Sequence, residues 1–166
     1  MTGEVVEEGL TQGFVRRRLI EPLFDLLRSG ATPERLAWSL AIGLVIGVNP
    51  LLGSTTLLAL LLVPVLRLNI VASQAANHLA YPLELLLFPV FLRMGSALFH
   101  TEPLPMGPEA MFHMARLHPW VTTRMLWRWE WHALVVWALF AVVVAPLVAL
   151  ALKPVLEKML AKVTTP

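Results

Sequence analysis

Two polar interruptions in otherwise apolar sequence contain the residue types that could bind a ligand. The first covers residues 49–55 and the second covers residues 77–84. Their candidate binding residues are Asn49, Gly53, Ser54, Thr55, Asn77, His78 and Glu84. The amide, imidazole and carboxylate groups of the second interruption could hold a proton or a cation. A helix capped by a hydroxyl in the first interruption could present its amides to an anion such as a phosphate headgroup.

Both interruptions also have a structural explanation that requires no ligand. Residues 49–55 could form a capped loop between two helices at the membrane surface. If a helix breaks at Pro82 near that surface, Glu84 is only an N-terminal charge in water. A carboxylate at membrane depth is costly and is a functional candidate for that reason, so the sequence leaves both explanations open for Glu84.

The sequence contains no recognisable catalytic or metal-binding motif. It has no cysteine, and His113 and His118 are five positions apart without a carboxylate cluster beside them, which argues against a metal site. A Gly-rich nucleotide loop, a Ser-x-x-Lys motif and a paired acidic motif for phosphoryl chemistry are also missing. We therefore predict no cofactor, no bound metal and no catalytic residue, and we interpret the protein as not an enzyme.

The composition indicates that the two interruptions belong to a membrane protein. Of the 166 residues, 57% are hydrophobic and 14% are charged, whereas a soluble domain has about 25% charged residues. Residues 36–66 form an uncharged run that would be about 46 Å long as one helix, against a hydrocarbon core of about 30 Å. We expect two short helices instead, at about 37–48 and 54–66, joined by the first interruption.

Residues 68–92 repeat this plan, because the second interruption lies near their middle. Arg35 and Arg67 flank the first pair of helices, so the pair enters and leaves on one side if both prefer the cytoplasmic face. Such short helices either span the bilayer or form a re-entrant hairpin. Paired broken helices point to a binding site in transporters, and two ordinary kinked hairpins are the alternative. Gly43 and Gly47 form a Gly-x-x-x-Gly pair, which we expect to pack against another helix.

Basic residues near the ends of the apolar runs favour contact with lipid headgroups rather than with nucleic acid. The arginines expected at headgroups are Arg16, Arg17, Arg18 and Arg67. The first three lie in residues 14–28, whose apolar residues recur at helical spacing and predict an amphipathic surface helix. We expect membrane lipids as partners, together with a second copy of the chain or another envelope protein, because so short a chain can hardly enclose a pathway alone.

The chain divides into four expected segments. Residues 1–31 form an N-terminal amphipathic segment, and residues 32–100 form a membrane core of two broken helical hairpins. Residues 101–131 combine a Pro-rich linker with a Trp- and Arg-rich belt of the interfacial kind. Residues 132–166 contain a transmembrane helix and a basic tail. The predicted fold class is therefore all-α, an integral membrane helical bundle.

Several short motifs follow one another in a fixed order through residues 33–95. They are Pro33-Glu34-Arg35-Leu36-Ala37, then Gly43 and Gly47, then Pro50-Leu51-Leu52-Gly53-Ser54-Thr55, Leu66-Arg67-Leu68-Asn69, Asn77-His78-Leu79-Ala80-Tyr81-Pro82 and Leu92-Arg93-Met94-Gly95. In this order they resemble domain-of-unknown-function family 2062, a family of small bacterial membrane proteins. The family more often has Pro and Thr where this chain has His78 and Ala80, so no role of that Pro or Thr carries over. The resemblance implies a multi-pass protein of the bacterial inner membrane and brings no settled activity.

These observations predict a protein that handles a lipid or a small solute at a polar site in the middle of the membrane, where the two interruptions meet. The alternative is a non-catalytic scaffold or assembly partner in the cell envelope, in which the interruptions are only turns. An intramembrane enzyme is the least supported class, because the sequence offers no nucleophile with a base beside it.

Overall fold

The structure, a computed structural model, describes residues 32–51, 53–101 and 108–164, and every regular element in these ranges is a helix. The helices are α3 (Pro33–Gly47), α4 (Thr55–Val65), α5 (Ile70–Leu79), α6 (Tyr81–Leu98), α7 (Pro108–Leu117) and α8 (Pro119–Thr164). The all-α prediction is confirmed for this part of the chain. The predicted amphipathic helix at residues 14–28, with Arg16, Arg17 and Arg18, lies outside the described residues.

Helices α3 and α4 form a hairpin around the first interruption. Their positions agree with the helices predicted at about 37–48 and 54–66, except that α3 begins at Pro33. The Arg35 guanidinium donates a hydrogen bond to the carbonyl oxygen of Arg67, beyond the end of α4, so the hairpin returns to the level at which it began. At 1.5 Å per residue α3 is about 22 Å long and α4 about 16 Å, so each is shorter than a hydrocarbon core of about 30 Å.

The second interruption is a kink rather than an open loop. Helix α5 ends at Leu79 and α6 begins at Tyr81, with Ala80 between them at φ −78° and ψ −8°, close to helical values. Pro82 lies in the first turn of α6 and has no amide hydrogen to donate to a carbonyl one turn earlier. The missing hydrogen bond explains why the helix is interrupted here although the backbone barely leaves the helical conformation.

Helices α3 and α5 approach each other until their backbones touch. A Cβ atom added to Gly43 would lie 2.2 Å from the carbonyl oxygen of Ser73. One added to Gly47 would lie 2.7 Å from the carbonyl oxygen of Asn77 and 2.7 Å from the Cβ atom of Ala80. No side chain can adopt such distances, so this geometry requires glycine at both positions. The contact places the end of α3 directly against the second interruption.

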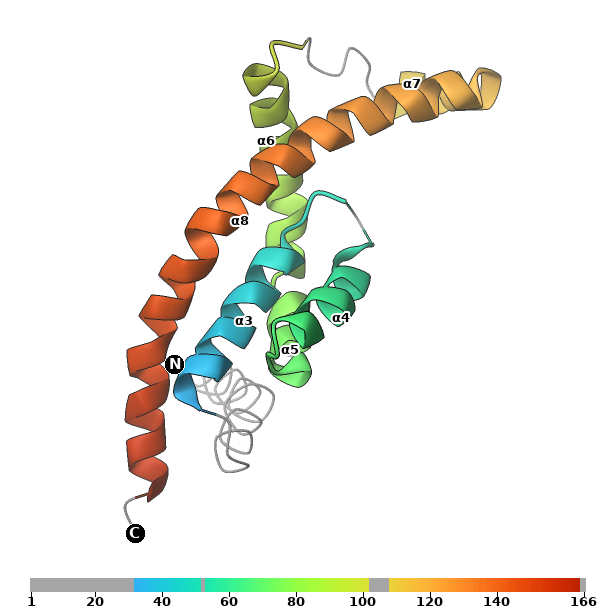
Figure 1. The fold of residues 1–166 in the computed structure, drawn as a ribbon. Helices are drawn as coiled ribbons and strands as arrows, with labels where there is room; N and C mark the ends of the chain where they lie inside the picture. The colour runs from blue at the N-terminus through green and yellow to red at the C-terminus, as the bar shows by residue number, and fades with distance from the viewer. Residues whose placement is uncertain (1–31, 52, 102–107, 165–166) are drawn as a thin grey trace, which may run out of the picture.

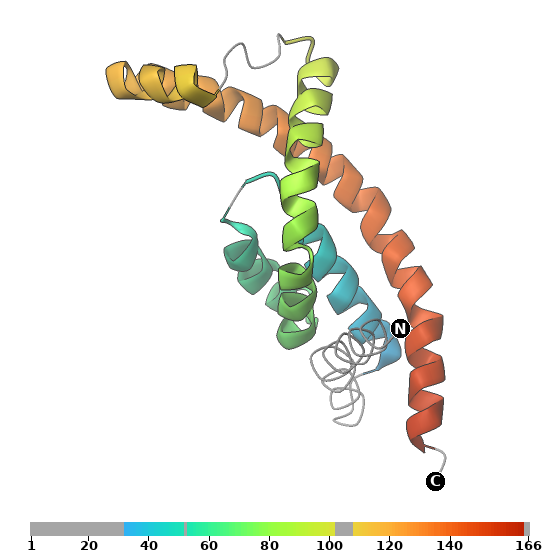
Figure 2. The ribbon, with the colours of Figure 1, turned by 180° about the vertical axis from the view of Figure 1, so that it is seen from behind.

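Helix α8 runs along α3 and α6 as one continuous helix of 46 residues. It curves along its length, and its first part extends away from the other helices together with α7 (Figure 1, Figure 2). The predicted boundary at residue 131, between the Trp- and Arg-rich belt and the segment with the spanning helix, falls inside α8. No glycine or proline occurs between Pro119 and Pro146, so nothing in the local sequence ends the helix there.

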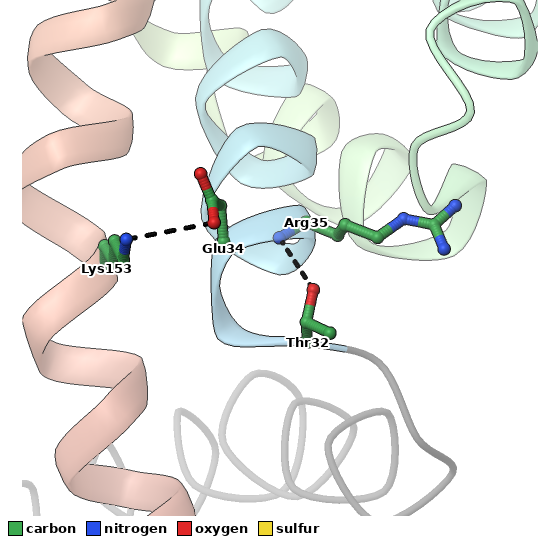
Figure 3. Close-up of polar contacts among 4 residues, drawn as sticks. All are labelled: Thr32, Glu34, Arg35 and Lys153. Atoms are coloured by element: carbon green, nitrogen blue, oxygen red, sulfur yellow. Dashed lines mark hydrogen bonds and ion pairs between the residues drawn. The ribbon is translucent and has the colours of Figure 1, made fainter.

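Contacts at both ends of α3 hold α8 in place. Near the start of α3, Lys153 pairs with Glu34 at 3.8 Å, beside the hydroxyl of Thr32 that caps the helix (Figure 3). Both charged groups are exposed, so the pair contributes at most about 1 kcal/mol. Near the end of α3, the indole of Trp137 donates a hydrogen bond to the Val45 carbonyl at 2.9 Å. The charged groups at the start of α3, which we term the charged edge, are Glu34, Arg35, Arg67 and Lys153.

Two described helices are long and apolar enough to cross a membrane, namely α6 and the Pro119–Met159 part of α8. Only 22% of the most apolar stretch of each helix is buried, so most of their apolar side chains face outward, unlike those of a helix in a soluble core. Helix α4 likewise exposes Leu57, Leu61 and Val65. Apolar surface that faces outward on three helices suits a chain surrounded by lipid.

The backbone contact at Gly43 can be tested with Gly43→Ala. In an ordinary helix this change would stabilise the protein by about 1 kcal/mol, but here the new methyl group would collide with the Ser73 backbone. We expect the variant to lose about 2 kcal/mol or more of its free energy of unfolding, measured by chemical unfolding in detergent micelles. Ala75→Leu adds a larger group to the exposed side of α5 and should unfold like the wild type. A Gly43→Ala variant as stable as the wild type would contradict the contact.

Candidate functional site

The structure buries four of the seven candidate binding residues almost completely. Those that expose at most 2% of their surface are Asn49, Thr55, Asn77 and Glu84. By contrast, Ser54 is half-buried, and Gly53 and His78 are exposed. The four buried residues lie after α3, at the start of α4, in the last turn of α5 and in the first turn of α6. With Gln74, described below, they make up what we term the polar junction.

Side chains of the first interruption stabilise its conformation by hydrogen bonds to backbone groups within the same segment. The Asn49 Oδ1 atom accepts a hydrogen bond from the Leu51 amide at 2.7 Å, and the Ser54 hydroxyl donates to the Leu51 carbonyl at 2.7 Å. Gly53 has a φ of +82°, which few other residues adopt. Ser54 precedes α4 at the capping position but makes no capping hydrogen bond with its side chain. These local bonds explain why the chain turns here between two apolar helices.

Gln74 connects the first turn of α4, directly after the first interruption, with Asn77 of the second interruption through two hydrogen bonds. Its Nε2 group donates to the Thr56 carbonyl at 3.4 Å, and its Oε1 atom accepts from Asn77 Nδ2 at 3.2 Å. The Thr56 carbonyl can only accept, so the amide of Gln74 must face it with its nitrogen and face Asn77 with its oxygen. Asn77 must then turn its own nitrogen toward Gln74. Its Oδ1 atom is thereby directed to Gly47, where an added Cβ atom would lie 3.0 Å away.

Three side chains of the polar junction have a buried polar atom for which the described residues provide no hydrogen-bond partner. The atoms are Asn49 Nδ2, Asn77 Oδ1 and Glu84 Oε1. Leaving such an atom unsatisfied costs about 1–3 kcal/mol, and more when the group is charged. The Asn49 amide can donate a hydrogen bond, and each of the two oxygen atoms can accept one or bind a cation.

Glu84 is joined to the rest of the junction through Ala80. The Glu84 amide donates to the Ala80 carbonyl at 2.9 Å, and the Ala80 Cβ atom lies against Gly47. The carboxylate therefore lies one helical turn beyond the α3–α5 contact, in the first turn of α6, where the helix dipole favours a negative charge. Its burial shows that Glu84 is not the charge in open water that one interpretation of the sequence allowed.

The structure differs from the predicted set of site residues at two positions, His78 and Gln74. The His78 ring is exposed, and its Nδ1 atom lies 2.7 Å from the Gln74 carbonyl oxygen. The ring packs against that of Tyr81, with 6.0 Å between the ring centroids. His78 therefore lies outside the junction. Gln74 was not among the predicted residues. The sequence does place it three positions before Asn77, a helical spacing at which amide side chains pair, but its bond to Thr56 depends on the fold.

A metal site among the described residues would need several ligating side chains that lie together. No group of three or more His, Cys, Asp or Glu side chains in this part of the chain is placed to hold a metal ion. A cation at the polar junction would instead depend on Glu84 and on amide oxygens such as that of Asn77.

Comparison with known proteins identifies the family. Residues 16–163 match the family described as "Uncharacterized protein conserved in bacteria (DUF2062)". The chain belongs to this family. The match confirms the resemblance seen in residues 33–95 and extends it over α7 and nearly all of α8, so the DUF2062 unit includes these helices. No curated protein and no solved structure matches the chain.

Replacing Gln74 tests whether its hydrogen bonds hold the start of α4 against the second interruption. Gln74→Met keeps the length of the side chain but leaves the Thr56 carbonyl and Asn77 Nδ2 without this partner, and we expect it to cost about 1–3 kcal/mol of unfolding free energy. Asn77→Ala should cost a similar amount, and the double variant should cost clearly less than the sum because the two residues share one hydrogen bond. Strictly additive losses, measured by unfolding in micelles, would show that the bond contributes nothing.

Proposed function

We propose that this protein is an integral membrane protein that binds a small polar solute, or the headgroup of a lipid, at the polar junction. The observation that carries the proposal is the set of almost fully buried side chains with unpaired polar atoms, Asn49, Asn77 and Glu84, among helices that are otherwise apolar. Ionisable residues at membrane depth are costly and commonly belong to the path of a substrate or an ion.

The charged edge supports a location of the junction inside the bilayer. Arg35 and Gly47, the last residue of α3, are 12 positions apart, which corresponds to about 18 Å, and Asn49 follows two residues later. With the charged edge at one headgroup layer, the junction lies about two-thirds of the way across a hydrocarbon core of about 30 Å. In this arrangement α3 and α4 form a re-entrant hairpin, while α6 and α8 complete the crossing of the bacterial inner membrane. Interrupted backbone at that depth must be buried in protein or line a wet cavity, and the contact at Gly47 supports such burial.

A membrane scaffold is the second candidate, and the α3–α5 contact favours it. Small residues that let backbones touch are the usual means of helix packing in membranes, and this packing needs no ligand. A scaffold explains Gly43 and Gly47, but it gives no reason for the carboxylate of Glu84. The two functions predict opposite rankings of variants. Binding makes Asn77 the most sensitive position, whereas packing makes Gly43 the most sensitive.

The depth of the first interruption can be measured with single cysteines, because the chain has none. A membrane-impermeant maleimide applied to sealed vesicles should label Ser54→Cys slowly and incompletely, because the thiol would lie in a confined polar site. Glu157→Cys, exposed beyond the charged edge, should react fast from one side. Leu61→Cys, exposed on α4 and facing lipid in this arrangement, should stay unlabelled. Labelling of Ser54→Cys as fast as that of Glu157→Cys would make the first interruption a surface loop and favour the scaffold.

Function itself is tested in a strain that lacks the gene, under an envelope stress in which the deletion impairs growth. We expect Asn49→Ala and Asn77→Ala to fail to restore growth although the variants reach the membrane in normal amounts, because the binding groups are gone. Ala75→Leu is the matched control on α5 and should restore growth fully. Restoration by both Asn variants, combined with failure of Gly43→Ala, would reject binding at the junction.

A further inference from the structure

Helix α8 is too long to lie within a bilayer. Its 46 residues extend over about 69 Å, more than twice the hydrocarbon thickness of about 30 Å. The uncharged run at residues 133–152 accounts for about 30 Å of this length. Residues 119–132 precede that run and, with α7, extend away from α3 and α5 (Figure 1), while the His132 ring at the end of this stretch stacks on Phe99 with centroids 4.2 Å apart. We term α7 and residues 119–132 the arm.

One face of the arm combines exposed tryptophans with a cation. Trp120, Arg124, Trp127 and Trp131 recur at spacings of four, three and four residues, so they lie on the same side of α8. The three tryptophans expose 86%, 57% and 56% of their surface in this order. Indole rings with this exposure are poorly placed in water but well placed at headgroup depth, where the apolar ring meets the acyl chains and the N–H group meets water.

The charge on this face suits an anion. Arg124 and Arg128 are both exposed, and they border a hollow of about 970 Å³. Trp120, Trp127 and Thr101, three residues after the end of α6, also line this hollow. The described residues that line the hollow include both arginines and no carboxylate. A guanidinium group binds phosphate through two parallel hydrogen bonds. Apolar walls beside two such cations match a molecule that carries a phosphate on long hydrocarbon chains.

We propose that the arm lies in the headgroup layer and binds an anionic phospholipid. The lipid phosphate pairs with Arg124 and Arg128, and its acyl chains contact the exposed tryptophans. Continuity with the uncharged run supports this occupant, because the same helix enters the hydrocarbon core directly after Trp131. The lipid site is separate from the polar junction and does not depend on the function proposed for it.

The test uses the whole protein reconstituted in phosphatidylcholine vesicles that contain a minor fraction of brominated lipid. Bromine quenches tryptophan fluorescence on contact, and four of the six tryptophans lie in the arm. Brominated phosphatidylglycerol should quench more strongly than brominated phosphatidylcholine at the same fraction. In the variant Arg124→Gln/Arg128→Gln the preference should fall by roughly fivefold for each arginine removed. Arg124→Lys/Arg128→Lys keeps the charge and should retain most of the preference.

Each other outcome would overturn the proposal. Equal quenching by the two lipids in the wild type, or an unchanged preference after Arg124→Gln/Arg128→Gln, would mean that these arginines do not select an anionic lipid. Quenching by neither lipid would mean that the face does not contact lipid, either because a second copy of the chain covers it or because the arm lies in water. Chemical crosslinking in the same vesicles would then distinguish the two, because only a second copy gives a crosslinked dimer.

Discussion

The backbone contact between α3 and α5 is the constraint on which the rest of the structure depends. Lipid is as apolar as leucine, so helices in a membrane gain little from hiding apolar side chains from one another and must gain from close packing and hydrogen bonds. Gly43 and Gly47 allow that packing, with Ser73 and Asn77 of α5 directly against them. Because Gly47 lies two residues before Asn49, the same contact brings both interruptions of the apolar sequence to one place. The hydrogen bonds of Gln74 then follow from the geometry.

The parts of the fold that depend on local chemistry could be predicted from the sequence. Asn49, Pro50 and Gly53 are all unfavourable inside a helix. The two helices on either side of them, α3 and α4, could therefore be predicted with nearly correct bounds. The continuity of α8 was missed because its composition changes sharply near residue 131, from Trp and Arg to apolar residues. The surroundings of a helix determine which side chains are favourable at each position. A change in those surroundings does not end the helix when no glycine or proline intervenes.

The burial of the candidate binding residues could be predicted only in part, for a physical reason. Asn49, Thr55, Asn77 and Glu84 stand out because polar residues are rare in apolar runs, and all four are buried. Exposure of His78 could not be derived from its type, since it depends on which side of α5 meets α3. Gln74 was overlooked because its partner Thr56 lies 18 positions earlier in the chain. Such a pairing is determined only when α4 and α5 are placed side by side.

The polar junction is costly for a protein that only has to pack its helices. Packing at Gly43 and Gly47 needs small residues, and it needs neither a carboxylate at Glu84 nor a free amide oxygen at Asn77. Unpaired buried atoms at about 1–3 kcal/mol each would offset a large part of the 5–15 kcal/mol by which a protein is ordinarily stable. Buried polar groups persist where water, an ion or a ligand completes their hydrogen bonds. The cost of the junction is therefore an argument that water, an ion or a ligand completes these hydrogen bonds. Water would serve a scaffold equally well, so the functional effect of replacing Asn49 and Asn77 is what distinguishes binding from scaffolding.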